Sequence, residues 1–157
     1  GASLTGLTSA QMPTGSVLQV TYDAKTTVVT TSSNTNSDIG ITASITPVSS
    51  SNPIYVEWFA PDNRKETGNT NLIIKLYRQI NGGGYSYLVT LTAGSLYLGS
   101  TALISAGASS IFKDTTHNST AQVDYKLYIS SGQNTAKVSI NKDNASHTGI
   151  RLMEVAG

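Results

Sequence analysis

The chain of 157 residues contains no cysteine and only two histidines, and its nine acidic residues are spread thinly along the sequence. Without cysteine the protein forms no disulfide and no thiolate metal site. The residues that most often carry catalysis are therefore scarce. This scarcity argues against an enzyme and favours a rigid module for display, binding or assembly.

Charge and long apolar runs are also in short supply. Charged residues make up 12% of the chain and the formal net charge is +1, with Lys and Arg scattered singly. Nucleic-acid binding relies on a basic stripe or patch, so we expect no nucleic-acid partner. No apolar run approaches the ~20 residues that a membrane-spanning helix requires, so we expect no membrane insertion.

Serine, threonine and asparagine supply 53 residues. They surround short segments in which apolar and polar residues alternate, with the period of half-buried β-strands. We count about nine to ten such segments at the spacing typical of sandwiches and barrels. The sequence therefore predicts an all-β fold, an antiparallel β-sandwich of jelly-roll type.

A chain of this length fits one domain. Residues 1–15 are small, polar and interrupted by Gly and Pro, so we interpret them as an incoming linker and residues 16–157 as the sandwich domain. The clearest core rows are in residues 39–46 and 121–130. The predicted core residues there are Ile39, Ile41, Ala43 and Ile45, then Val123, Tyr125, Leu127 and Ile129.

The middle of the chain is harder to divide. Pro61 is predicted to end the strand at 54–60, because proline cannot donate to a sheet ladder. Residues 61–70 are charge-rich and carry no aliphatic or aromatic side chain, which predicts an exposed loop. Residues 71–80 and 85–92 flank a Gly-rich turn and predict a β-hairpin. Between residues 105 and 120, Ile111–Lys113 is predicted as a short strand.

Three predicted strands, at 54–60, 71–80 and 149–156, carry apolar residues on both faces. A sheet face that met only water would be polar. The apolar residues opposite the core rows are therefore predicted to contact another copy of the chain; they are Tyr55, Phe59, Ile73 and Tyr77. In the alternative interpretation, loops such as 93–110 fold over this outer face.

No recognisable motif for catalysis or metal binding is present. His117 and His147 lie in polar turn segments at a spacing that matches no metal motif, so we interpret both as solvated loop residues. None of the serines has the strand–turn–helix setting of a hydrolase nucleophile. We therefore predict no catalytic residue, no metal ion and no cofactor.

Recognition on rigid β-scaffolds is usually carried by loops. The first candidates are residues 61–70 and 82–87, which we place at one end of the sandwich. They offer polar groups beside aromatic faces, which suit a sugar; the predicted ligand-binding residues are Asp62, Asn63, Arg64, Tyr85 and Tyr87. In the alternative interpretation both loops are plain solvated turns, and the tyrosines only pack across the sheet.

Three segments together resemble a known family: MPTGSVLQV at 12–20, ITASITPVSSSNPIYV at 41–56 and IRLMEVA at 150–156. The pattern is similar to the C-terminal β-modules of tail-fibre and other virion-surface proteins of tailed bacteriophages, and it covers most of residues 12–156. The resemblance implies a compact sandwich assembled as a homotrimer on the virion surface. It transfers no defined binding residue onto this chain, and the charged segment 61–70 departs from the family pattern.

The resemblance implies a structural virion protein: a trimeric fibre-tip or host-receptor-binding domain, with residues 1–15 as the end of a preceding fibre segment. Its expected partners are a host cell-surface glycan or protein, or other virion proteins. One alternative is a capsid decoration or head-fibre protein. Another is a carbohydrate-binding module of a larger surface protein, while a hydrolase is disfavoured by the sparse acidic residues.

Overall fold

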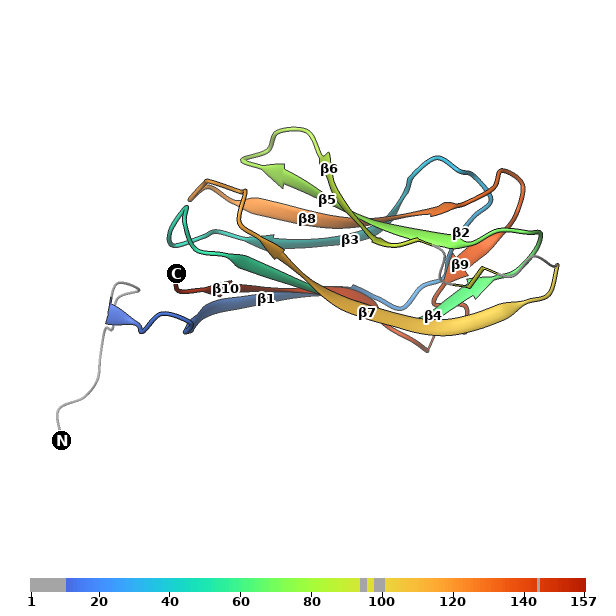
Figure 1. Cartoon of the computed structure of the whole chain (residues 1–157), viewed down its shortest axis with the longest axis horizontal. Coiled ribbons are helices and arrows are strands. Elements are labelled where there is room, and N and C mark those ends of the chain that lie inside the picture. Colours follow the sequence, from blue (N-terminus) through green and yellow to red (C-terminus); the bar gives the residue numbers. More distant parts are fainter. Residues whose placement is uncertain (1–10, 94–95, 98–100, 144) are drawn as a thin grey trace.

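The computed structural model describes residues 11–93, 96–97, 101–143 and 145–157. Within these ranges the chain forms ten β-strands and no α-helix, in two antiparallel sheets (Figure 1), which confirms the predicted β-sandwich. No helix in the described part is long and apolar enough to cross a membrane. The strands are β1 (Val17–Lys25), β2 (Val29–Thr31), β3 (Ser37–Ile45), β4 (Ile54–Lys65), β5 (Leu72–Ile80), β6 (Ser86–Thr92), β7 (Ile104–Asp114), β8 (Val123–Ser131), β9 (Val138–Ile140) and β10 (Thr148–Val155).

We call the two layers sheet A and sheet B. Sheet A has the order β1-β10-β4-β9-β2, and sheet B has the order β3-β8-β5-β6. The long strand β4 has β7 along one side. On its other side β4 pairs first with β10 and, near its end, with β9.

The strand pairs are nested along the chain. β5 pairs with β6, β4 with β7, β3 with β8 and β1 with β10, all antiparallel. Folding such a nested set of pairs into two sheets gives the double Greek key of a jelly roll. The observed topology therefore agrees with the predicted jelly-roll type.

The core lies between the two sheets and is formed by alternate residues of the strands. The predicted rows of β3 and β8 are buried throughout, with exposed fractions of 0–2%. Trp58 on β4 is the largest fully buried side chain. Each of these strands turns its other residues outward, as the period of two requires.

The prediction that Pro61 ends its strand is wrong. β4 continues to Lys65, and its register with β7 shifts between Ala60 and Asn63. Pro61 lies at this irregularity, where the ladder is already interrupted and the missing N–H leaves no partner unsatisfied. Gly107 on β7 provides room, since a Cβ there would lie 3.1 Å from the Pro61 carbonyl oxygen.

The region after β6 also differs from the prediction. In place of a short strand at Ile111–Lys113, β7 runs from Ile104 to Asp114 beside β4. Residues 104–110 are therefore part of sheet A and not a loop over an outer face. The remainder of the predicted covering segment includes residues 94–95 and 98–100, which lie outside the described residues, as do residues 1–10 of the predicted linker.

A buried carboxylate fastens the β3–β4 turn to the last strand. Glu154 on β10 has no exposed surface and accepts hydrogen bonds from the backbone N–H groups of Val48 and Ser49. The side-chain amides of Gln19 and Asn52 also donate to it. Burial alone would raise the pKa of Glu154, but these four donors outweigh it and lower the pKa below its ordinary value.

We therefore expect the protein to lose stability in acid. A carboxylate whose pKa is lowered in the folded state stabilises that state above its unfolded pKa, and the contribution is lost as the pH falls through the folded pKa. Melting temperatures should decline below about pH 5. Replacing Glu154 with Gln should flatten this decline while lowering the melting temperature at pH 7; an unchanged pH profile would contradict the assignment.

Candidate functional site

The two predicted ligand loops lie at opposite ends of the sandwich. β5 begins at Leu72 and ends at Ile80, so the segment 66–71 precedes it and the turn 81–85 follows it (Figure 1). The prediction that these loops share one end is therefore wrong, and they do not form a single site.

Asp62, Asn63 and Arg64 belong to β4 and are held by internal contacts. The exposed fractions of Asp62 and Asn63 are 6% and 1%, so the predicted exposed loop at 61–70 is wrong for this stretch. The Asn63 side chain donates to the carbonyl oxygen of Ala60. Buried side chains present no surface to a glycan, so Asp62 and Asn63 serve the fold.

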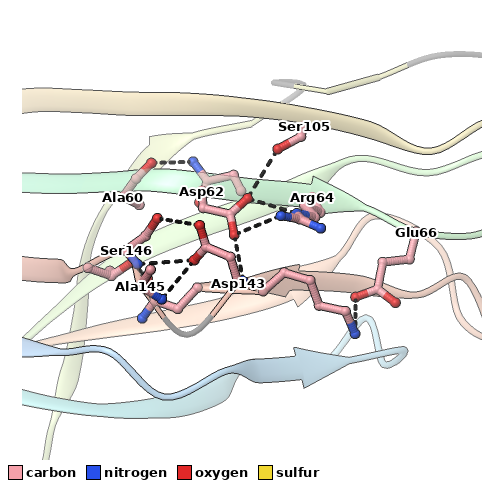
Figure 2. A network of polar contacts seen from close by, with 12 residues as sticks. Ala60, Asp62, Arg64, Glu66, Ser105, Asp143, Ala145 and Ser146 are labelled. Atoms are coloured by element: carbon pink, nitrogen blue, oxygen red, sulfur yellow. Dashed lines mark hydrogen bonds and ion pairs between the residues drawn. The ribbon is translucent and has the colours of Figure 1, made fainter.

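Figure 2 shows the hydrogen bonds and the ion pair that the Asp62 carboxylate forms. It accepts hydrogen bonds from the Arg64 guanidinium at 2.8 Å, from Ser105 on β7 at 3.1 Å and from the backbone N–H of Asp143 at 3.2 Å. Burial would raise the pKa of Asp62, yet these contacts keep it below its ordinary value. The network joins β4, β7 and the loop before β10. The charges of Asp62 and Arg64 are therefore paired with each other within the molecule.

Tyr85 and Tyr87, by contrast, lie on a cluster of aromatic side chains on the outer face of sheet B. Tyr87 on β6 stands opposite Tyr77 on β5, and their rings make an edge contact with centroids 5.9 Å apart. Tyr77 also packs against Tyr128 on β8, at 4.3 Å. We call Tyr77, Tyr85, Tyr87 and Tyr128 the tyrosine patch.

Charged and amide groups surround the tyrosine patch. Lys126 on β8 lies 4.8 Å from the centre of the Tyr85 ring and forms an ion pair with Asp38 at 2.7 Å. On the neighbouring strand, Lys75 donates to the side-chain oxygen of Asn36. The amide of Asn36 in turn donates to the Tyr77 hydroxyl at 2.6 Å.

Burial raises the pKa of Tyr85 and that of Tyr128, helped by the negative charges of Asp124 and Asp38 respectively. Both hydroxyls therefore stay protonated at neutral pH and can both donate and accept hydrogen bonds. Tyr87 is 55% exposed and offers most of a ring to solvent. The patch thus combines flat apolar faces with fixed polar groups, which is the composition of a recognition surface.

The four residues predicted to contact another copy divide between the two outer faces. Tyr55 and Phe59 lie on sheet A, whereas Ile73 and Tyr77 lie on sheet B, with the core between them. All four are partly buried within the single chain. No single flat interface contains the whole set, and Tyr77 already belongs to the tyrosine patch.

The outer face of sheet A carries its own apolar surface. Four of the eight large apolar side chains that are exposed in the described part come from β1 and β7; they are Val17, Val20, Tyr22 and Ile111. Tyr22 stacks on Phe59, with ring planes 9° apart, across Gly149. The Arg151–Glu57 ion pair lies beside them. A sheet face that contacts only water would carry polar side chains, whereas this face carries several exposed apolar ones.

Sequence reasoning missed Tyr128, although it alternates with the core row of its own strand. The signal was present in the outward positions of β8, where Asp124, Lys126 and Tyr128 follow one another. It also misjudged His117, which is 3% exposed and not solvated. Among the described residues no group of three His, Asp or Glu side chains is arranged to hold a metal ion.

Comparisons with known proteins add little to this geometry. No family model matches the chain, and no curated protein matches its sequence. A solved structure with a similar fold is that of Eiger TNF from S. frugiperda, at 11% identity and a TM-score of 0.42. The match covers 87% of this chain and 92% of that one. A likeness at this level supports no argument about function.

Proposed function

We propose that this chain is a non-enzymatic attachment domain, the receptor-binding tip of a virion fibre, which binds a cell-surface glycan through the tyrosine patch. The observation that carries the proposal is the gathering of four tyrosines from β5, β6, β8 and the β5–β6 turn on one outer face. The resemblance to phage fibre modules supports the setting on a virion.

A pyranose ring suits this surface. Its apolar C–H face can lie on the exposed ring of Tyr87, which provides contact area at low entropic cost because the tyrosine side chain has few rotatable bonds. Its hydroxyl groups can meet the Tyr77 hydroxyl, the Asn36 amide and the Lys75 ammonium, which already form a connected set. The tyrosines orient the ligand and the polar groups select it.

The attachment domain is proposed to be a homotrimer in which the outer face of sheet A contacts the neighbouring subunits. Its exposed apolar side chains on β1 and β7 support this, since larger exposed patches mark interaction sites. With sheet A directed towards the subunit contact, sheet B and the tyrosine patch remain on the outside of the assembly. One domain can then carry the subunit contact on sheet A and the glycan site on sheet B.

We expect replacement of Tyr87 with Ala to weaken glycan binding at least about tenfold, since exposed aromatic anchors often dominate recognition energy. The parent domain is applied to a glycan array, and the strongest binder is then titrated against the variant. Tyr97→Ala is the matched control, because Tyr97 is also exposed, at 61%, and lies outside the patch. Absence of glycan binding by the parent, or equal loss in both variants, would contradict the proposal.

A carbohydrate-binding module of a larger surface protein is the second candidate function, favoured by the same row of aromatic side chains on an exposed sheet face. The two functions differ in assembly. Light scattering distinguishes them, since a trimer supports the fibre tip and a monomer that binds glycans supports the module.

A further inference from the structure

A cleft of about 490 Å³ lies at the end of the sandwich where β4 passes into β5 and β8 into β9. One wall is residues 67–69, and the other is residues 133–136. In Figure 1 this end lies away from the C-terminus and from the start of β1. The volume is within the range of small-molecule sites in proteins.

The two loops are joined on both sides of the cleft. On one side, the N–H of Gly132 donates to the carbonyl oxygen of Asn71, and the N–H of Gln133 donates to the Thr70 hydroxyl. On the other side, the N–H of Glu66 donates to the carbonyl oxygen of Lys137. A Cβ on Gly68 would lie only 2.8 Å from the Ala136 Cβ, so the two loops also touch between these hydrogen bonds. These contacts fix the two walls of the cleft relative to each other.

Thr135, on the rim of the cleft, has a backbone φ of 73°. This left-handed conformation is unusual for a β-branched residue, and its strain persists only where the surroundings impose it. Here the N–H of Thr135 donates to the carbonyl oxygen of Ser32 at 2.8 Å. Such strain is found at ligand sites more often than in ordinary loops.

The lining carries no charged residue. Asn69 and Gln133 are exposed, and neither side-chain amide has a hydrogen-bond partner among the described residues. Each amide can donate two hydrogen bonds and accept on its oxygen. Uncharged groups that donate and accept together match the hydroxyl groups of a neutral sugar, and they offer no counter-ion to a charged one.

We propose that this cleft is a second binding site of the chain, for a neutral saccharide, bound by hydrogen bonds to the Asn69 and Gln133 amides. It lies apart from the tyrosine patch and does not depend on glycan binding there. The strained loop at Thr135 holds the Gln133 wall in place before the ligand arrives.

The test is a nuclear magnetic resonance titration of the ¹⁵N-labelled chain with three neutral sugars: lactose, maltotriose and chitobiose. At least one is expected to shift the amide signals of residues 67–69 and 133–136, including the side-chain NH₂ signals of Asn69 and Gln133. Glucuronic acid should not shift them. No shift at the cleft with any of the three neutral sugars would overturn the proposal.

Two variants assign the binding to the cleft. The double variant Asn69→Ala with Gln133→Ala should weaken binding at least tenfold, whereas Gln122→Ala, an exposed glutamine in the β7–β8 loop, should not. Thr135→Gly should fold at least as stably as the parent, because glycine adopts a positive φ freely, yet bind more weakly. Unchanged affinity in both would overturn the proposal. Tyr87→Ala should leave cleft binding intact, which separates this site from the tyrosine patch.

Discussion

Replacing Asp114 with Ala is expected to lower the free energy of unfolding by about 3–5 kcal/mol, the usual cost of removing one partner from a buried ion pair. Asp114 is the last residue of β7, and its side chain has no exposed surface. It accepts hydrogen bonds from Arg78 on β5 at 2.7 Å and from the hydroxyl of Tyr125 on β8 at 2.7 Å. One carboxylate thus joins sheet A to two strands of sheet B.

The loss would be large because both partners would remain buried. Arg78 would keep its charge with only 14% of its side chain exposed, and the Tyr125 hydroxyl would lose its acceptor. Burial raises the pKa of Tyr125 and the negative charge of Asp114 raises it further, so this hydroxyl remains a donor. Burial also acts to raise the pKa of Asp114, but its hydrogen bonds outweigh this and keep it ionised.

Urea denaturation followed by circular dichroism measures this difference. Typical domains are stable by about 5–15 kcal/mol, so the variant should retain little of its folded population at moderate urea. Asp38→Ala is the control, because the Asp38–Lys126 pair lies at the surface, with 35% of the Asp38 side chain exposed, and surface pairs contribute about 0–1 kcal/mol. Equal midpoints for the two variants would show that Asp114 does not join the sheets energetically.

Replacing Val20 with Asp is expected to dissociate the proposed trimer, lowering the mass in solution to that of one chain of 16.5 kDa. Val20 is 52% exposed on the outer face of sheet A, in the same cross-strand row as Met153 and Tyr55. In a subunit contact the new carboxylate would be buried without a partner, at a cost of several kcal/mol. In the separate chain it would face water at little cost.

Light scattering of both proteins gives the result directly. Leu103→Asp serves as control, since Leu103 is 60% exposed but lies in the loop before β7 and outside the row of Val20, Met153 and Tyr55. A parent that is already monomeric would contradict the trimer. A Val20 variant that keeps the parent's trimeric mass would place the contact elsewhere, with Ile73 on the outer face of sheet B as the remaining predicted contact.

The alternation of apolar and polar residues was enough to predict the class of fold and the inward rows of β3, β4, β5 and β8. It failed after Pro61, because Asp62 and Asn63 are polar yet buried, and each forms hydrogen bonds with other groups of the chain. It also failed for β7, whose small residues are exposed on both faces and so show no period. Patterns report burial and do not report which polar groups are paired.

The candidate site was only half visible in the sequence for a different reason. Tyr85 and Tyr87 stand out beside a Gly-rich turn, but Tyr128 lies more than forty residues further along the chain. Whether these rings meet depends on the pairing of β8 with β5 and of β5 with β6. A single sequence does not give strand order, so the patch becomes visible only in the folded sheet.

The nested pairing of the strands makes folding a late event. Val17 pairs with Val155, across almost the whole chain, and β10 separates β1 from β4 in sheet A. During synthesis, the edges of β1 and β4 that pair with β10 therefore stay unpaired until β10 leaves the ribosome. Topologies dominated by such distant pairs fold in milliseconds to seconds and not in microseconds. Until β10 arrives, the nascent chain exposes edges on which it can associate with other chains.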